Sequence, residues 1–506
     1  MSTQRNPWLA LSALVVGFFM ILLDVTIVAV ANPAILDSLH ADISQVIWVT
    51  SAYLLTYAVP LLITGRLGDR FGPKNIYLIG LSVFTLASLW CGLSGTIEML
   101  IAARAVQGLG AALMTPQTMA VITRTFPPDK RGAAMGLWGG VAGLATLVGP
   151  ILGGVLVDNL GWEWIFFVNV PVGIVAFVLA WKLVPALETH AHKFDIPGVV
   201  LSGIGMALLV FGIQEGNTYD WSLRIWLLIG AGVVVLALFI VNQARNTGEP
   251  LVPLSLFRDR NFGLSNLAIA AMGAATTAVM VPSYFYLQAV REMSPTESAL
   301  VFAPMAIITG VMAPFVGKFA GRLHPRVVPT IGFTLFAISV AWFAQLMTPD
   351  SDIIWFLVAA GLAGFANAFI WAPLATTATH NLPVQKAGAG AGIYNTTRQV
   401  GAVLGSAAIS ALIAARMAAN GLGDAPAGEG TAGPIPEPVK AAFSSALADS
   451  TYLPAAILLI GVLASVLFLR PGVAAPPKPP TERAKAVHRR ILVSESVIEA
   501  AAPHER

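Results

Sequence analysis

The chain has 506 residues, of which 56% are hydrophobic and 11% are charged, and its formal net charge is +3. Soluble domains carry about 25% charged residues, so this composition excludes an ordinary soluble enzyme. A net charge of +3 would ordinarily suggest weak affinity for nucleic acid or anionic surfaces, but here the basic residues are distributed over loops in a way that reports topology, so no nucleic acid partner is expected. The single cysteine, Cys91, excludes an intramolecular disulfide, and its apolar surroundings indicate a buried small hydrophobe.

Apolar stretches recur along nearly the whole sequence. A helix needs about 20 apolar residues to cross a hydrocarbon core of about 30 Å. Fourteen stretches of this kind are predicted, at residues 8–31, 46–64, 76–94, 99–122, 133–157, 164–184, 196–214, 223–242, 262–287, 299–317, 328–347, 353–374, 389–414 and 452–469. The first is read as a mature helix, because it is longer than the apolar part of a signal peptide and contains Asp24. The expected fold class is an all-α polytopic membrane protein.

Lys and Arg are concentrated in alternate loops, as the positive-inside rule requires of cytoplasmic loops. One side holds Arg66, Arg70, Lys74, Arg124, Lys130, Arg131, Lys182, Lys193, Arg245, Arg258, Arg260, Lys318, Arg322, Arg326 and Lys386, together with Arg5 and the basic tail. The other side holds only Arg224, Arg291, Arg416 and Lys440. Both termini are therefore expected in the cytoplasm, which requires an even number of spans.

An internal repeat divides the chain. Residues 65–74 match residues 317–326, and the glycine-rich residues 132–136 match residues 388–392 at nearly the same offset. Duplicated halves are how many transporters build a central site that opens to alternate sides. The expected domains are a six-helix bundle in residues 1–190, two inserted helices in 191–260 and a second six-helix bundle in 261–470. We expect an external loop at 416–451 and a disordered basic cytoplasmic tail at 471–506 that can touch anionic lipid head groups.

The sequence offers no sign of ATP, metal or cofactor chemistry. Gly317 and Lys318 lack the upstream Gly and the following Ser or Thr of a phosphate-binding loop. The seven His lie mostly in loops and the tail, and no nucleophile has a base at a suitable spacing. We therefore expect neither an enzyme nor a bound metal or cofactor, which leaves an ion gradient as the ordinary energy source.

Three ionisable side chains lie well within predicted spans, namely Asp24, Arg104 and Arg398. A charge at a helix centre costs about 2.5–3.5 kcal/mol on the insertion scale, so such residues face a cavity or a partner. Asp24 and Arg104 lie roughly 12 Å and 9 Å from the outer ends of their helices at 1.5 Å per residue, which allows them to pair. Such a pair can be a fixed structural contact. It can also be a proton-coupling site, because burial raises the pKa of a carboxyl group and a nearby guanidinium lowers it, so that separating the two groups would lead to proton uptake.

Other residues in the spans suggest a cavity and bent helices. Asn395, Arg398 and Gln399 share one helical face, which we expect either to line a wet cavity or to form a packing network. Residues 149–154 combine Gly149, Pro150, Gly153 and Gly154, which predicts a bent and closely packed helix.

Five motifs in order make the chain similar to the fourteen-span drug:proton antiporters of the major facilitator superfamily, of the EmrB/QacA type. They are residues 23–28 with Asp24, residues 65–74, residues 104–110 with Arg104 and Gln107, residues 149–154, and residues 162–171. The resemblance implies a cytoplasmic gate, which we place at Gly65, Asp69, Arg70, Gly72, Lys74 and Arg131. It also implies proton transfer involving Arg104, with Asp24 as the proton carrier, and an antiporter bend at 149–154. Gln107 is expected to join the polar side chains of the cavity.

The combined interpretation is a proton-coupled exporter of small lipophilic molecules in a bacterial cytoplasmic membrane. Its partners are the substrates, protons and membrane lipids, and a monomer is sufficient. The tenth span has no membrane acid. Members of the family it resembles that export divalent organic cations can carry one there, so the resemblance implies monovalent or neutral lipophilic substrates. Gly321 lacks the acid of the first-half gating loop, which leaves the substrate open. The alternatives are an exporter of one endogenous metabolite or lipid, an importer or uniporter on the same fold, and a non-transporting membrane sensor.

Overall fold

In the computed structural model of the chain, each of the fourteen segments predicted as spans lies on one or more helices. The structure describes residues 6–126, 128–187, 189, 195–246, 248–320, 323–380, 382, 387–422 and 437–470, and these contain no strand. The α-helices are α1 (Pro7–Leu39), α2 (Ile43–Phe71), α3 (Pro73–Gly92), α4 (Ile97–Thr125), α5 (Pro128–Leu160), α6 (Trp164–Phe167), α7 (Asn169–Leu183), α8 (Ile196–Gln214), α9 (Leu223–Arg245), α10 (Arg260–Phe285), α11 (Pro295–Val301), α12 (Ala303–Ala320), α13 (Val327–Leu346), α14 (Ile353–Ala368), α15 (Trp371–Thr379), α16 (Ala387–Ala419) and α17 (Glu437–Val466). A 3-10 helix, η1 (Leu254–Arg258), precedes α10, and a π-helix, η2 (Tyr286–Val290), extends it.

In the described part of the chain, twelve spans are long and apolar enough to cross a membrane, and α2 makes thirteen if its two segments count as one. The described apolar part of α5, Val148–Leu160, is shorter than a span. The all-α membrane fold is thus confirmed, and the count of fourteen stays a prediction. Three predicted spans are each divided between two helices, α6 with α7, α11 with α12, and α14 with α15.

The predicted start of the last span was wrong, because α17 begins at Glu437 and not near residue 452. Residues 437–451 are polar enough to resemble a loop, but one face of this segment is buried. Ser444 Oγ donates to the Met347 carbonyl at 2.7 Å, and Leu447 is fully buried. Lys440 Nζ reaches Glu292 Oε1 at 2.7 Å. Residues 423–436 of the predicted loop, and the predicted tail, lie outside the described residues.

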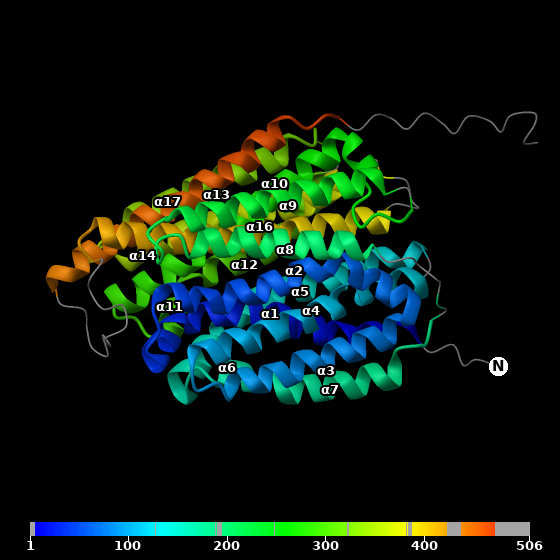
Figure 1. Ribbon diagram of the computed structural model, residues 1–506, viewed down its shortest axis with the longest axis horizontal. Helices are drawn as coiled ribbons and strands as arrows, with labels where there is room; N and C mark the ends of the chain where they lie inside the picture. The colour runs from blue at the N-terminus through cyan, green and yellow to red at the C-terminus, as the bar shows by residue number, and fades with distance from the viewer. Residues whose placement is uncertain are drawn as a thin grey trace, which may run out of the picture. The chain divides into compact units, whose positions relative to one another are not determined.

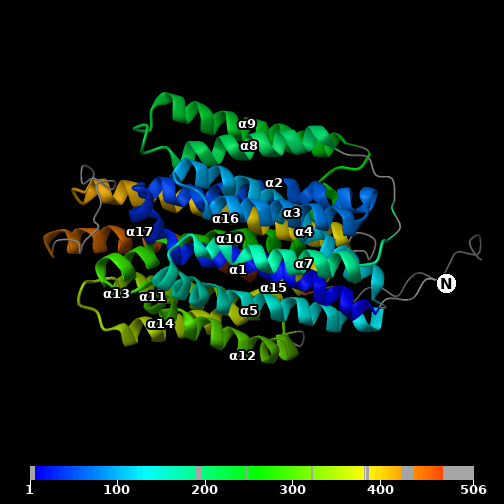
Figure 2. The same cartoon turned by 90° about the horizontal axis from the view of Figure 1, so that it is seen from below.

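The helices pair in a repeated pattern. In the first half α1 packs against α5 and α7, α3 against α4 and α7, and α2 against α4. The second half repeats these pairs as α10 with α16 and α17, α13 with α14 and α17, and α12 with α14. Between the halves α2 packs against α16, and α5 packs reciprocally against α11 and α12. The helix pairs of the two halves thus correspond to each other. The helices run roughly along the horizontal axis of Figure 1, and α1 lies beside α10 near the centre of Figure 2.

The inserted helices α8 and α9 pack against each other outside this pattern, and α8 contacts α2 and α16. Figure 2 shows them at one edge of the helices. Asp195, the N-cap of α8, holds the start of α8 against the end of α9. It accepts hydrogen bonds from Gln243 Nε2 at 2.6 Å, from the Gly198 N–H at 3.0 Å and from Asn242 Nδ2 at 3.3 Å. The following loop is fixed to α2 by Arg66, which donates to the carbonyls of Glu249 and Pro250, both at 2.6 Å.

We expect Asp195→Asn to lower the free energy of unfolding by about 1–3 kcal/mol at neutral pH, because an amide nitrogen would then face Gln243 Nε2. Burial raises the pKa of Asp195, but the hydrogen bonds from Gln243, Gly198 and Asn242 outweigh it and hold the pKa below its ordinary value of 3.8. A carboxyl whose folded pKa is depressed stabilises the protein above its unfolded pKa and loses that effect as the pH falls through the folded pKa.

The measurement is unfolding of the purified protein at several pH values. The difference between wild type and variant should be constant from pH 7 to about pH 5 and should close below about pH 4. The control is Asp352→Asn, at an exposed helix N-cap whose side chain makes no capping hydrogen bond. A variant as stable as wild type at pH 7 would contradict this role of Asp195.

Candidate functional site

A buried ion pair joins α1 to α4. Arg104 Nη1 lies 2.6 Å from Asp24 Oδ2, and the exposed fractions of the two side chains are 1% and 0%. Arg104 Nη1 also donates to Gln107 Oε1 at 2.6 Å, and Gln107 Nε2 donates to Asp24 Oδ1 at 2.9 Å. Arg104 and Gln107 are three residues apart on α4, so they share the face that points at Asp24. The three side chains form a closed ring of charge-assisted hydrogen bonds.

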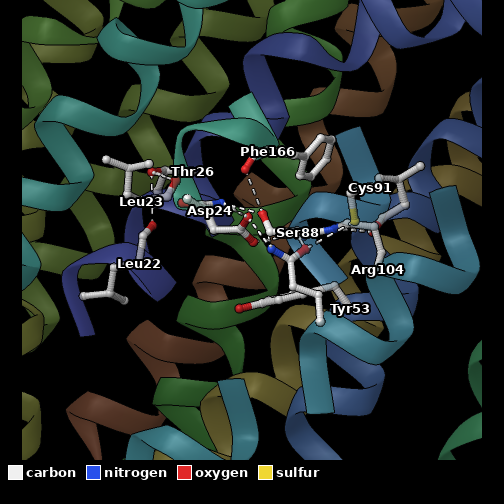
Figure 3. Close-up of polar contacts among 12 residues, drawn as sticks. Leu22, Leu23, Asp24, Thr26, Tyr53, Ser88, Cys91, Arg104 and Phe166 are labelled. Atoms are coloured by element: carbon white, nitrogen blue, oxygen red, sulfur yellow. Dashed lines mark hydrogen bonds and ion pairs between the residues drawn. The ribbon is translucent and has the colours of Figure 1, made fainter. Parts of the chain in front are cut away.

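Two further polar residues complete this network. Asn169, at the start of α7, donates from Nδ2 to Asp24 Oδ1 at 3.1 Å and to Ser88 Oγ at 3.0 Å. Ser88 of α3 also accepts from Gln107 Nε2 at 3.2 Å and donates to the Phe166 carbonyl at 3.0 Å. Figure 3 shows Asp24, Ser88 and Arg104 converging from their helices. The carboxylate therefore has three donors, although no residue of the network is more than 1% exposed.

Aromatic rings enclose the guanidinium of Arg104. Its Cζ lies 4.1 Å from the ring centroid of Tyr53 and 5.7 Å from that of Phe166, and its Nε donates to the Val49 carbonyl at 3.2 Å. A cation over an aromatic face is stabilised by the ring quadrupole, most strongly where water is absent. The pair is thus enclosed by side chains of α1, α2, α3, α4, α6 and α7 in apolar surroundings.

The structure changes the assignment of Gln107 and adds residues that the sequence did not indicate. Gln107 was expected to line a cavity with the polar residues of α16, but it is fully buried in the Asp24 network, because it follows Arg104 by one helical turn. Ser88 and Asn169 were not predicted. Asn169 lies in the 162–171 motif, and a lone amide at the start of an apolar run was the available signal.

The predicted gate residues lie at the junction of α2 and α3. Asp69 forms an ion pair with Arg124 of α4, a residue that the sequence indicated only as a cytoplasmic charge. Lys74 Nζ donates to the Trp181 carbonyl at 2.5 Å, and Gly72 links the helices with a φ of 91°, which favours glycine. A Cβ atom added at Gly65 would lie 3.8 Å from Pro116 Cβ, which is an ordinary van der Waals distance, so packing does not require glycine at this position. Arg70 Cζ lies 5.4 Å from the Phe71 ring, and the Arg131 side chain is outside the described part.

The glycines of residues 149–154 allow α5 to approach other helices closely. A Cβ on Gly149 would lie 2.0 Å from Thr26 Oγ1, and one on Gly153 would lie 2.6 Å from Ile27 Cγ1, so α5 packs on α1 just beyond Asp24. A Cβ on Gly154 would lie 2.6 Å from Thr296 Cα of α11. Pro150 lies inside the same helix. Any larger side chain at these glycines would push α5 away from its neighbours.

Hydrogen bonds join the two halves at the end opposite the gate residues. Gln288 Nε2 of η2 donates to the Val30 carbonyl at 2.9 Å, and the Thr296 N–H of α11 donates to Asp158 Oδ2 at 3.0 Å. Ser51 Oγ and Ser406 Oγ of α2 and α16 are 2.8 Å apart. The second half is thus contacted directly by α1, which carries Asp24, and by α5, which packs against α1.

The predicted polar face of α16 is separate from the Asp24 network. Gln399 is buried and Asn395 is half-buried. Arg398 Cζ lies 5.8 Å from the Trp371 ring of α15. No described hydrogen bond or ion pair connects these residues to Asp24 or Arg104.

Comparison with known proteins identifies a family. A model described as Major Facilitator Superfamily matches residues 14–406. The chain is 54% identical over 472 residues to the Uncharacterized MFS-type transporter Rv1250 of Mycobacterium tuberculosis, covering 92% of this chain and 81% of the relative. It is 37% identical to the Tetracenomycin C resistance and export protein of Streptomyces glaucescens, with 82% and 77% covered.

The Multidrug export protein EmrB of Escherichia coli is 33% identical to the chain, with 78% of each covered. A crystal structure of a bacterial homologue of the human lysosomal transporter Spinster superposes with a TM-score of 0.60. It covers 92% of this chain and 97% of that one at 17% identity, which supports the fold alone.

We expect Arg104→Met to lower the free energy of unfolding by about 3–5 kcal/mol, because Asp24 would be left as an unpaired charge out of water. The double variant Asp24→Leu with Arg104→Met removes both charges and should be more stable than the single variant. Unfolding of the purified variants in mixed micelles measures both effects. Equal losses in the single and double variants would show that the uncompensated charge is not the cause.

Proposed function

This chain belongs to the Major Facilitator Superfamily, and on that premise we propose that it is a proton-coupled antiporter that exports small lipophilic molecules from the cytoplasm by alternating access. It is a multi-pass protein of a bacterial inner membrane. The observation that carries the proposal is the fully buried Asp24–Arg104 pair on helices of one half. Ionisable residues within a membrane mark ion and proton pathways.

The packing of the helices suggests how conformation acts on this pair. α1, which carries Asp24, contacts α10 and α11 of the second half, and α5 contacts α11 and α12. Both α1 and α4, which carries Arg104, contact mainly helices of the first half, but α1 also packs appreciably against the second half. Rocking of the second half would therefore move α1 relative to α4 and lengthen the ion pair.

The electrostatics then link this movement to proton transfer. While Arg104 and the amides of Gln107 and Asn169 hold Asp24, its negative charge is compensated. Once the guanidinium moves away, the carboxylate stands in apolar surroundings, where desolvation favours its protonated form. Return of Arg104 favours the charged form again and releases the proton. One cycle thus carries a proton through the half that contains the pair.

The direction of transport and the kind of substrate rest on the relatives. Two of the similar proteins are named as exporters, one of tetracenomycin C and one of multiple drugs. The pair Asp69–Arg124 lies at the end where the positive-inside rule places the cytoplasm. We propose that it belongs to the inner gate, and that the contacts of Gly154 and Gln288 belong to the outer one.

The test is uptake of a lipophilic fluorescent dye into energised inverted vesicles, with proton release measured in parallel. Asp24→Asn keeps the shape of the side chain but cannot take up and release a proton. We expect at least a tenfold fall in proton-driven uptake, and no dye-dependent proton release.

Asp37→Asn is the matched control, because Asp37 lies on the same helix and is exposed. It should transport as wild type does. Coupled transport that persists unchanged in Asp24→Asn would remove Asp24 from the mechanism, and uptake that requires ATP without a gradient would overturn the energetic scheme.

A further inference from the structure

Arg398, near the middle of α16, is a cation that the proton-transfer mechanism does not use. Within the described part of the chain its side chain makes no ion pair and no hydrogen bond, and its Nε is buried without a partner. A guanidinium carries five N–H donors in a fixed planar arrangement. A structural arginine would use several of them, as Arg104 does. Arg398 therefore offers unused donors at the depth where a membrane charge is most costly.

The surroundings of Arg398 are aromatic and come from both halves. Its Cζ lies 5.8 Å from the ring centroid of Trp371 on α15. Tyr394 precedes Arg398 by one helical turn on α16, and Tyr57 of α2 lies close enough for a coulombic interaction with the guanidinium. Tyr57 packs in the same apolar cluster as Val403 of α16, which places the interface of the halves at this level. Binding at the interface of the repeats is what alternating access requires.

The hydroxyl of Tyr394, one helical turn before Arg398, is also buried and has no hydrogen-bond partner among the described residues. Tyr57 Oη, by contrast, lies 2.9 Å from Thr115 Oγ1. Buried hydroxyls are normally satisfied, so an unsatisfied one next to an unpaired cation points to a polar ligand. The cluster offers a cation, a hydroxyl donor and aromatic faces, and no acidic side chain among the described residues pairs with its cation.

We propose that Arg398 binds the anionic group of an aromatic substrate, either a carboxylate or a phenolate, while Trp371, Tyr57 and Tyr394 contact its ring. A guanidinium matches the two oxygens of a carboxylate with parallel hydrogen bonds. Aromatic side chains add stacking or edge contacts with the substrate ring. The assignment rests on the proposed export function and predicts that the exported substrate is anionic and contains an aromatic ring.

The position of this site also connects it to the proton-coupling pair. Arg104 lies against the ring of Tyr53, with 4.1 Å from Cζ to the ring centroid, and the Tyr53 and Tyr57 rings are 5.9 Å apart. Tyr57 in turn lies within the field of Arg398. Two tyrosines one turn apart on α2 thus lie near the two guanidinium groups, Tyr53 against Arg104 and Tyr57 near Arg398. A substrate anion that displaces Tyr57 would disturb the packing on Arg104.

The test measures equilibrium binding to the full chain in lipid nanodiscs without any gradient. The probes are 9-anthracenecarboxylate and its neutral amide, which share a fluorescent ring, and empty nanodiscs give the lipid background. We expect the carboxylate to bind wild type at least about tenfold more tightly than the amide, as a charge-assisted hydrogen bond provides. Arg398→Gln should abolish this preference, and Arg398→Lys should retain part of it.

Arg416→Gln is the matched control, because Arg416 lies on the same helix in an exposed pair with Asp449. It should keep the full preference. Equal binding of carboxylate and amide to wild type would overturn the proposal without any variant, and so would an undiminished preference in Arg398→Gln. Because no gradient is applied, binding by Asp24→Asn as strong as that of wild type separates this proposal from a failure of proton coupling.

Discussion

Two opposite charges lie out of water between α1 and α4, and much of the first half is arranged around them. Moving an ion into the protein interior costs several kcal/mol even after relaxation, so a buried pair persists only when its remaining donors and acceptors are satisfied. Here Gln107, Asn169 and the Val49 carbonyl satisfy them, while Tyr53 and Phe166 exclude water. This requirement draws six helices to one point and explains why polar residues lie at the centre of otherwise apolar segments.

The same constraint decides which helices matter for coupling. α1 is held against α5 by Gly149 and Gly153, so a displacement of α5 by the second half reaches α1 within a turn of Asp24. Gly154 places α5 against α11 at the same time. Of the inserted helices, α8 contacts α2 and α16 from outside while α9 packs against α8, and no described hydrogen bond or ion pair joins either helix to Asp24 or Arg104. Their exposed apolar side chains, such as Leu223, Leu227 and Val234, suit contact with lipid.

Much of this could be expected from the sequence, because the rules for membranes act on single segments. Apolar length gave the spans, and comparable depth allowed Asp24 and Arg104 to meet. The family followed from motifs in order. The environments of single side chains were harder to predict. Gln107 follows Arg104 by one turn, so the direction of its side chain depends on where the Asp24–Arg104 pair lies. No partner could be predicted for Ser88, Asn169 or Arg124. The helical period shows which residues share a face, but not which neighbouring helix that face contacts. The start of α17 was missed because a half-buried amphipathic helix resembles a polar loop.

The central claim is that the protonation of Asp24 follows the arrangement of the two halves. The most direct measurement is infrared difference spectroscopy of the carboxylic acid C=O band, assigned to Asp24 by its loss in Asp24→Asn. Asp158→Cys with Thr296→Cys allows a thiol cross-linker to hold α5 against α11, while Cys91 is buried and protected. We expect Asp24 to stay ionised in the cross-linked protein. In the free protein, energised and transporting, the band of the protonated carboxylic acid should appear. A protonated Asp24 to the same extent in both would contradict it.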